Sequence, residues 1–388
     1  MSIITKGKFK NKKVIIRFDW NVPIINGDIQ STKRIDDSLQ TLDYILKQKP
    51  TRIYIISHLG RPTSRNDYHL SLRPVFKYLK SIYKEQIGFV SFLGDITNVK
   101  NTILLLENIR FFKEETQMIE TTCAFREQLT SMGDIFVNDA FGCIHRPHSS
   151  IIGIDCKEKY IGFLVQKELN CIQTLFSSFT KKDIVMIIGG SKIKDKIDIL
   201  SNLIPRVNSI IIGGSMANTF LKYTGVNIGQ SKIDKEGLSM CKIIFDMSKK
   251  YDTKIELPID FVCNDHFSNQ GNIETCDLKN MLSQHMIMDI GIKSIIRCKE
   301  IISKHKCVVW NGPLGVFEFE HFSNGTFSIM HFLTRCKFIK TCLGGGDTAS
   351  CFEKSKLDKS KVDHISTGGS AFLELLKGKE LIGVQYCK

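Results

Sequence analysis

The sequence contains no pair of cysteines spaced C-x-x-C, although it has 13 cysteines among its 388 residues. This absence excludes zinc-ribbon and thioredoxin-type motifs, which need that spacing. Scattered cysteines in odd number are typical of proteins in a reducing compartment, where disulfides are rare. We therefore expect a cytoplasmic location.

Long hydrophobic runs are also absent. No stretch reaches the length of about 18 apolar residues that a membrane-spanning helix needs. The segment Met1–Lys13 is basic but lacks the apolar core of a signal peptide. We expect neither a membrane span nor a membrane partner.

Several nucleotide- and nucleic-acid-binding motifs are missing. The Gly-Lys steps at Gly7 and Gly378 lack the context of a Walker A loop. The glycine-rich loop and the H-R-D loop of protein kinases are missing as well. No RNA-recognition or zinc-finger signature accompanies the net charge of +14. This charge fits either a solvated lysine-rich surface or small anionic partners, and we expect no requirement for nucleic acid.

The sequence does contain a repeated alternation of short apolar runs and segments of helical periodicity. Continuous apolar runs are typical of strands buried on both faces, and their alternation with helices predicts α/β architecture with parallel sheets. Eight such runs occur, at residues 13–17, 52–56, 103–106, 135–137, 184–188, 210–212, 307–310 and 338–342. The length exceeds what one hydrophobic core usually supports, so we expect two domains.

The segment 164–179 separates the first four runs from the last four. Its apolar residues have helical spacing and predict one helix. They are Leu164, Leu169, Ile172, Leu175 and Phe176. We interpret this helix as the connection between two α/β lobes; a crossover helix within one large sheet is the alternative.

Polar and basic residues follow the strands of the first half. Ligands bind beyond the carboxyl ends of parallel strands, and arginine matches carboxylate or phosphate oxygens with paired donors. A single arginine would more often form a surface ion pair, but several at corresponding strand ends indicate a site for a small, multiply charged anion. These strand-end residues include Arg17, Asp19, Asn21, Arg34, His58, Arg61, Arg110 and Arg146.

Glycines follow the strands of the second half. They let backbone amides approach a phosphate group or a base closely, and the helix starts beyond them favour anions. One Gly-Gly pair is often only a tight turn, whereas four such turns in one half indicate a nucleotide site. The turns are Gly189–Lys192, Gly213–Met216, Asn311–Gly315 and Gly344–Thr348.

Charged and hydroxyl side chains accompany these glycines. Lys192 and Lys196 lie four residues apart, so both can face one side of a helix start. Asp347 and Thr348 offer the hard oxygen ligands that Mg²⁺ prefers.

Six longer motifs occur in order along nearly the whole chain. They are R-F-D-W-N-V-P at 17–23, S-H-L-G-R-P at 57–62, L-E-N-I-R-F at 106–111, W-N-G-P-L-G-V-F-E at 310–318, G-G-G-D-T at 344–348 and S-T-G-G-S-A-F-L-E-L-L at 366–376. Together they resemble the motifs of the phosphoglycerate kinase family.

The resemblance implies an α/β fold with two Rossmann-like parallel-sheet domains joined by a hinge helix. Residues 1–163 are expected to form a phosphoglycerate-binding domain, on which the C-terminal segment 371–388 packs back. Residues 164–179 are expected to form the interdomain helix, and residues 180–370 the nucleotide-binding domain.

The resemblance also implies where each substrate binds. The acid, 3-phosphoglycerate or 1,3-bisphosphoglycerate, is expected to contact Asp19, Asn21, Arg34, His58, Leu59, Gly60, Arg61, Arg110 and Arg146. ADP or ATP is expected to contact Lys192, Lys196, Gly213, Gly214, Asn311, Glu318, Gly345, Gly346, Asp347 and Thr348. Asp347 is expected to hold Mg²⁺. The residues expected to surround the transferring phosphoryl group are Arg34, Lys192, Lys196, Gly346 and Gly369.

The implied reaction is a reversible, in-line transfer of the acyl phosphate of 1,3-bisphosphoglycerate to ADP after hinge closure. The attacking group is already a phosphate oxygen, so positioning and charge neutralisation are expected to supply the catalysis. His58 is expected to donate a hydrogen bond rather than act as a base. The family also implies a monomer.

Four residues depart from the family pattern. Trp20 stands in place of phenylalanine, Ser215 and Ser370 replace glycines, and Lys194 replaces a small residue. Three alternatives stay open: a binding protein that has lost turnover, a kinase for another small acid, and an added affinity for nucleic acid.

Overall fold

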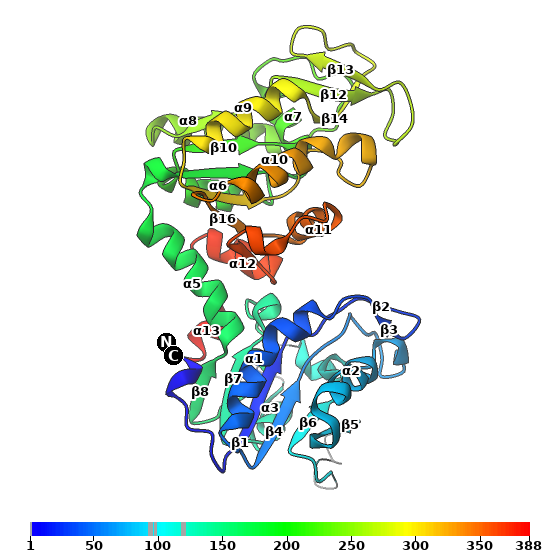
Figure 1. The fold of residues 1–388 in the computed structure, drawn as a ribbon, viewed down its shortest axis with the longest axis vertical. Helices are drawn as coiled ribbons and strands as arrows, with labels where there is room; N and C mark the ends of the chain where they lie inside the picture. Colours follow the sequence, from blue (N-terminus) through cyan, green and yellow to red (C-terminus); the bar gives the residue numbers. More distant parts are fainter. Residues whose placement is uncertain (1, 92–95, 97–98, 118–121) are drawn as a thin grey trace. The chain divides into compact units, whose positions relative to one another are not determined.

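The computed structural model describes residues 2–91, 96, 99–117 and 122–388. The chain forms two compact units, one of residues 1–170 with 380–388 and one of residues 171–379 (Figure 1). Each unit contains its own parallel sheet with helices, as the sequence predicted. The C-terminal part that belongs to the first unit begins at Glu380, later than the expected residue 371.

The first unit is built on a six-stranded parallel sheet in the order β5-β6-β4-β1-β7-β8. Its strands are β1 (Lys13–Phe18), β4 (Arg52–Ile56), β5 (Ile87–Val90), β6 (Ile103–Leu106), β7 (Ile135–Asp139) and β8 (Glu158–Ile161). The four runs predicted in the first half form β1, β4, β6 and β7, the interior of the sheet. The edge strands β5 and β8 were not predicted, since an edge strand needs less continuous apolar sequence.

Helices pack on this sheet, and its strand β1 is covered on both faces, since residues 14–18 are all buried. The helices are α1 (Lys33–Lys47), α2 (Arg73–Tyr83), α3 (Cys123–Thr130) and α4 (Ser149–Ile152), and a short hairpin of β2 (Ile24–Ile25) and β3 (Asp28–Ile29) precedes α1. Alternate residues of β1, Val14, Ile16 and Phe18, share one core cluster with Leu42 of α1 and Leu79 of α2. Alternation along the strand therefore directs every second side chain against the same two helices.

The predicted helix at 164–179 is confirmed as α5 (Phe163–Ser178). Its first turn is fixed to the first unit by side chains of β7 and α1. The Val165 N–H donates to Asp139 Oδ1 at 3.0 Å, and the Phe163 N–H donates to Thr41 Oγ1 at 2.9 Å. These two acceptors satisfy amides that the helix itself leaves without a partner.

Asp139 gives the first unit a testable pH dependence. Burial raises the pKa of this carboxyl group to about 7, well above the value of about 3.9 in an unfolded chain. Its contribution to stability is therefore complete below about pH 4 and is lost as the pH rises towards 7. We expect the unfolding free energy of the native chain to decrease as the pH rises from about 5 to about 8. This decrease should exceed that of the Asp139→Asn variant by on the order of 2 kcal/mol. Urea unfolding of both proteins measures this difference, and equal losses would contradict the assignment.

The second unit contains a six-stranded parallel sheet in the order β11-β10-β9-β15-β16-β17. Its strands are β9 (Ile184–Ile188), β10 (Ser209–Ile212), β11 (Lys254–Glu256), β15 (Cys307–Asn311), β16 (Lys340–Leu343) and β17 (His364–Ile365). The four predicted runs of this half form β9, β10, β15 and β16. The run at 338–342 was placed too early, because Phe338 is 93% exposed and precedes the strand.

The helices of the second unit are α6 (Ile197–Leu203), α7 (Gly214–Tyr223), α8 (Gly237–Lys250), α9 (Ile292–Ser303), α10 (Asn324–Arg335), α11 (Gly346–Lys354) and α12 (Gly369–Leu376). One core cluster joins Val185 of β9 and Val308 of β15 to Ile295 of α9, Ile329 of α10 and Phe352 of α11. On the chain, α7 and α11 begin directly after β10 and β16, so their amino-terminal ends lie at the carboxyl edge of the sheet.

A three-stranded antiparallel sheet, not predicted from the sequence, completes the second unit. It has the order β13-β12-β14 and consists of β12 (Asp260–Asn264), β13 (Glu274–Asp277) and β14 (Met286–Ile290). Its strands are followed by no Gly-Gly turn and contain no long apolar run, which are the signals that mark the parallel strands.

The last helix, α13 (Ile382–Gln385), belongs to the first unit. The Gly383 N–H donates to the Ile144 carbonyl oxygen at 3.0 Å, and the Ser2 N–H donates to that of Cys387 at 3.3 Å. The two ends of the chain therefore lie side by side (Figure 1). Among the described residues, no helix is both long and apolar enough to cross a membrane.

Candidate functional site

Arg34 and Asp19 form an ion pair beyond the carboxyl end of β1. Arg34, in the first turn of α1, approaches both carboxylate oxygens of Asp19 at 3.4 Å and donates to the Asn21 carbonyl oxygen at 3.3 Å. The Arg34 side chain is 38% exposed, whereas that of Asp19 is 9% exposed. The guanidinium group is thus oriented by the protein and still accessible to a dissolved anion.

Further contacts join the loop after β4 to the loop after β6. The Gly60 N–H donates to Asn21 Oδ1 at 2.8 Å, and Arg110 Nη1 donates to the Gly60 carbonyl oxygen at 2.6 Å. The Asn108 side chain accepts from the Leu59 N–H at 3.2 Å and donates to its carbonyl oxygen at 2.7 Å. Gly60 has a φ of +59°, a conformation that favours glycine. The structure therefore brings Asn21, Leu59, Gly60 and Arg110 together.

A buried ion pair lies beneath the surface at this edge of the sheet. Arg17 and Glu115 have fully buried side chains, with Arg17 Nη2 and Glu115 Oε1 3.9 Å apart. Ser150 accepts from Arg17 Nε at 2.8 Å and donates its hydroxyl to Glu115 at 2.7 Å. Arg17 Nη2 also lies 3.0 Å from Nδ1 of His58, whose Nε2 lies 3.9 Å from Asp19 Oδ1. Glu115 was not predicted from the sequence, because no motif distinguishes a buried glutamate from an exposed one.

Burial and neighbouring positive charges lower the pKa values of three groups in this region. Burial, with Arg17 and Arg110 nearby, holds the pKa of His58 well below its usual range. Burial lowers the pKa of Arg110 to about 10, with Arg17 adding to the shift. Burial and Arg110 lower the pKa of His148 to about 3. A bound anion would therefore relieve unfavourable positive potential, and a neutral His58 suits hydrogen bonding.

The remaining two predicted acid-binding residues lie around the same edge. Arg61 is exposed and directly follows Gly60. Arg146 is half-buried, with Nε 3.4 Å from Nε2 of His145. Its charge contributes to the lowered pKa of His58, which places it within electrostatic reach of the cluster.

A cavity of about 250 Å³ opens in the second unit where β9, β10 and β15 end. Its size is close to the lower end of small-molecule sites, which begin at roughly 300 Å³. Three predicted nucleotide-binding residues, Gly214, Glu318 and Asp347, line it. The walls that the sequence did not predict come largely from the antiparallel sheet: Phe261, Met286, Ile287, Met288, Asp289 and Ile290.

A hydrogen-bond network connects the strand-end loops of the second unit. Lys196 Nζ donates to Asn311 Oδ1, and Asn311 Nδ2 donates to the Gly344 carbonyl oxygen at 2.7 Å. Thr348 Oγ1 accepts from the Gly312 N–H at 2.7 Å and donates to Gly344 at 2.9 Å. Burial lowers the pKa of Lys196. The network holds Lys196, Asn311 and Thr348 in fixed positions relative to each other.

Two glycines allow close approach of backbone segments. Gly345 has a φ of +103°, and a Cβ there would lie 2.4 Å from Asn311 Nδ2. A Cβ on Gly369 would lie 2.9 Å from the amide nitrogen of Gly346, the first residue of α11. The starts of α11 and α12 therefore meet at glycines, and side chains are excluded from the contact.

The other predicted residues of this half lie beside the cavity. A Cβ on Gly213 would lie 2.3 Å from Cδ2 of Leu314, which lines the cavity. Lys192 is exposed and directly follows Gly190 and Ser191, both of which line the cavity.

The residues that depart from the family pattern are accommodated. Trp20 is buried, and its Nε1 donates to Ser38 Oγ at 2.8 Å. Ser215 lines the cavity, whereas Ser370 is exposed in the first turn of α12. Lys194 is 62% exposed and forms a surface ion pair.

Asp347 fits a role as a magnesium ligand. Its carboxylate is exposed in the first turn of α11 and lines the cavity together with Glu318. Mg²⁺ is commonly held by one or two carboxylates together with substrate phosphates and water. The Thr348 hydroxyl, in contrast, is already engaged by Gly312 and Gly344.

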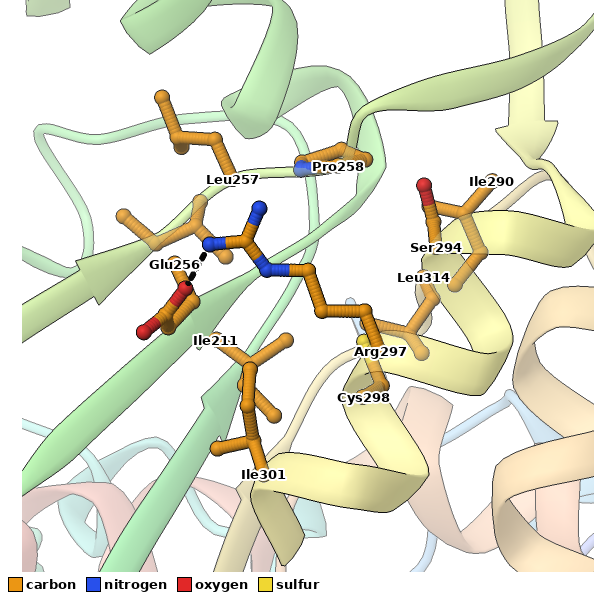
Figure 2. Close-up of a pocket in the computed structure, with 11 residues that line it drawn as sticks. Ile211, Glu256, Leu257, Pro258, Ile290, Ser294, Arg297, Cys298, Ile301 and Leu314 are labelled. Carbon is orange, nitrogen blue, oxygen red and sulfur yellow. Dashed lines mark hydrogen bonds and ion pairs between the residues drawn. The ribbon is translucent and has the colours of Figure 1, made fainter.

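A second hollow of about 10 Å³ lies beside α9 (Figure 2). Arg297 reaches across it to Glu256, with Nη2 and Oε2 2.5 Å apart. The volume has room for about one water molecule, so this hollow holds no substrate.

Comparisons with known proteins agree with one another. A family model described as phosphoglycerate kinase matches residues 4–379. The phosphoglycerate kinase of Dictyostelium discoideum is 40% identical over 405 aligned positions, which cover 98% of this chain and 96% of the relative. That of Finegoldia magna is 38% identical over 385 positions, covering 97% and 96%.

Solved structures show the same relationship. The phosphoglycerate kinase of Coxiella burnetii has a TM-score of 0.88 and 31% identity, and the match covers 99% of this chain and 97% of that one. The enzyme of Pyrococcus horikoshii has a TM-score of 0.83 and 28% identity, with 100% and 98% coverage. These matches show that the chain belongs to the phosphoglycerate kinase family and is a kinase.

Proposed function

We propose that this chain catalyses the reversible, Mg²⁺-dependent transfer of the acyl phosphate of 1,3-bisphosphoglycerate to ADP, which yields 3-phosphoglycerate and ATP in glycolysis. The observation that carries the proposal is the contrast between the two units. Arginines and histidines gather at the strand ends of the first unit. In the second unit, glycine turns and an exposed aspartate border a cavity.

The acid substrate binds the first unit in this proposal. Arg34 and Arg110 contact its phosphate or carboxylate oxygens, and His58 donates a hydrogen bond. The residues assigned to this role are Asp19, Asn21, Arg34, His58, Leu59, Gly60, Arg61, Arg110 and Arg146. Arg110 supports this role in particular, because burial and the nearby Arg17 lower its pKa and a bound anion would stabilise its charged form.

The nucleotide binds the second unit, in contact with Lys192, Lys196, Gly213, Gly214, Asn311, Glu318, Gly345, Gly346, Asp347 and Thr348. Asp347 would hold Mg²⁺, which supplies neutralisation of phosphate charge. Arg34, Lys192, Lys196 and the amides of Gly346 and Gly369 stabilise the transferring phosphoryl group. No covalent intermediate on the enzyme is involved, because the phosphate oxygen of ADP attacks directly.

The transfer requires that both substrates meet, so we also propose closure about α5, which runs from Phe163 in the first unit to Ser178 in the second. Closure would exclude water from the acyl phosphate. The same proposal takes residues 1–163, 164–179 and 180–370 as the functional divisions, and the protein as a cytoplasmic monomer.

A coupled assay with several acids tests the function and its alternatives. We expect ATP consumption with 3-phosphoglycerate and Mg²⁺, and a rate lower by orders of magnitude when acetate or aspartate replaces 3-phosphoglycerate. Ligand binding without turnover would favour the binding protein, and faster turnover of another acid would favour a different kinase.

The contact between α11 and α12 gives a prediction on rate. Gly369→Ala is expected to reduce kcat by about 100-fold, because its Cβ would lie 2.9 Å from the Gly346 amide that faces the phosphoryl group in our proposal. Ser370→Gly is the neighbouring control and is expected to change kcat by less than about threefold, since the Ser370 side chain is exposed. Steady-state kinetics of both variants provide the measurement, and a reversed order of effects would be incompatible with the proposal.

A further inference from the structure

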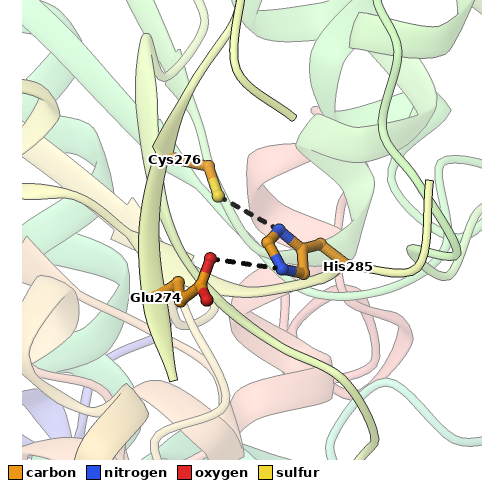
Figure 3. A group of neighbouring side chains, drawn as sticks. All are labelled: Glu274, Cys276 and His285. Carbon is orange, nitrogen blue, oxygen red and sulfur yellow. Dashed lines mark hydrogen bonds and ion pairs between the residues drawn. The ribbon is translucent and has the colours of Figure 1, made fainter. Parts of the chain in front are cut away.

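A thiol, an imidazole and a carboxylate gather on the antiparallel sheet of the second unit (Figure 3). Cys276 Sγ lies 3.2 Å from Nδ1 of His285, and Glu274 Oε2 lies 3.4 Å from Nε2 of the same ring. Glu274 and Cys276 are alternate residues of β13, so their side chains share one face of the sheet. His285 directly precedes β14. Folding, rather than sequence spacing, brings the three side chains together.

The burial of the three residues differs in a way that suits a binding site. Cys276 is 4% exposed and His285 2% exposed, whereas the Glu274 side chain is 45% exposed. The surrounding core therefore holds the Cys276 and His285 side chains in place, whereas the Glu274 side chain can change its rotamer at the surface. The thiol of Cys263 lies next to that of Cys276, so a second sulfur atom is close to the three side chains.

The distances are compatible with a single small cation. One ligand atom from each side chain can be chosen so that all three lie within 4.8 Å of one another. In a tetrahedral zinc site, bonds of about 2.0–2.3 Å place neighbouring ligand atoms about 3.5 Å apart. Cys276 and Glu274 face different nitrogens of the His285 ring, so a cation bound to Cys276 Sγ and His285 Nδ1 takes Glu274 as its third ligand only after this exposed carboxylate rotates towards Nδ1.

We propose that Glu274, Cys276 and His285 bind a borderline-soft divalent cation of the Zn²⁺ class, with water completing the coordination. Thiolate and imidazole favour Zn²⁺, whereas Mg²⁺ requires oxygen ligands, so this site is distinct from the one assigned to Asp347. On binding, the Cys276 thiol releases its proton to solvent and a sulfur–metal bond forms. Affinity therefore decreases as the pH falls.

The cation has a structural role. It joins β13 to the segment that enters β14, where the Gln230 N–H also donates to the His285 carbonyl oxygen at 2.7 Å. Met286 and Ile287, the next residues along β14, line the large cavity. Metal binding would thus rigidify one wall of that cavity, and it does not depend on the proposed catalytic reaction.

Titration of the full chain with Co²⁺ tests the site. After chelation and dialysis with a non-thiol reductant, we expect one equivalent of Co²⁺ to produce the thiolate-to-cobalt charge-transfer absorbance, which Zn²⁺ then removes. Cys276→Ser should abolish this absorbance. Glu274→Gln should weaken the affinity at least about tenfold, since even outer-shell changes commonly have this effect. Zn²⁺ should raise the melting temperature of the native chain and leave that of Cys276→Ser unchanged.

Cys298→Ser is the matched control, because Cys298 is another buried thiol of the same unit that lies on α9. It should retain the native absorbance. Glu274→Gln keeps the test decisive if Cys276→Ser folds poorly, since Glu274 is exposed. The proposal is overturned if the native chain gives no saturable absorbance, if Cys276→Ser gives the same absorbance through the other cysteines, or if a folded Glu274→Gln binds with native affinity.

Discussion

Replacement of Arg34 by alanine is expected to reduce kcat by about 10³-fold, the scale seen when an arginine that stabilises a transferring phosphoryl group is removed. Arg34 is the residue of the first unit whose guanidinium is both oriented by Asp19 and 38% exposed. Its five donors match the oxygens of a phosphoryl group. Steady-state kinetics with 3-phosphoglycerate and ATP measure the effect.

The fold should survive this change. The Arg34 side chain is 38% exposed although that of Asp19 is only 9% exposed, so loss of this ion pair should cost on the order of 1 kcal/mol, a small part of the total stability. Lys47→Ala is a suitable control, because Lys47 is an exposed cation in the last turn of the same helix, and it should leave kcat unchanged. A folded Arg34→Ala variant with near-native kcat would show that Arg34 does not stabilise the transferring phosphoryl group.

Lys196→Met is expected to lower kcat by at least about 100-fold, with a smaller change in the KM for ATP. Lys196 is partly buried and held by Asn311 at the carboxyl edge of the second sheet. Burial lowers the pKa of its ammonium group, so its positive charge is poorly solvated and should interact strongly with a phosphate that gains charge in the transition state. A group that stabilises the transition state selectively affects kcat more than KM.

Lys194→Met is the matched control for this variant. Lys194 lies two residues earlier, is 62% exposed and pairs with Glu236 at 2.9 Å. Its removal should change kcat by less than about twofold, because an exposed ion pair is well screened. Equal effects of the two substitutions would mean that Lys196 acts only through net charge.

The sequence predicted the strands that consist of continuous apolar runs and the residues that come directly after them. The strands β1 and β9 were predicted because a strand buried on both faces needs such a run, and the residues after them were then known to share one sheet edge. Arg34 and Lys196 could be selected in this way. The edge strand β8, with polar residues at its start, carried too weak a signal.

What the sequence could not predict depends on contacts between distant segments. The pairing of Arg17 with Glu115 joins residues far apart in the chain, and nothing local shows that both side chains are buried. The cavity wall formed by β14 arises from antiparallel pairing, and no Gly-Gly turn marks this strand in the sequence. The approach of Cys276 to His285 likewise follows from the path of the loop between β13 and β14.

The most direct test of phosphoryl transfer follows a radiolabelled γ-phosphate of ATP in the presence of the native chain, Mg²⁺ and 3-phosphoglycerate. We predict that the label appears on the carboxyl group of 3-phosphoglycerate, that it returns to ADP when the reaction is reversed, and that Arg34→Ala and Lys196→Met each suppress the transfer. Release of the label as inorganic phosphate alone, or tight binding of both substrates with no transfer by the native chain, would contradict this prediction.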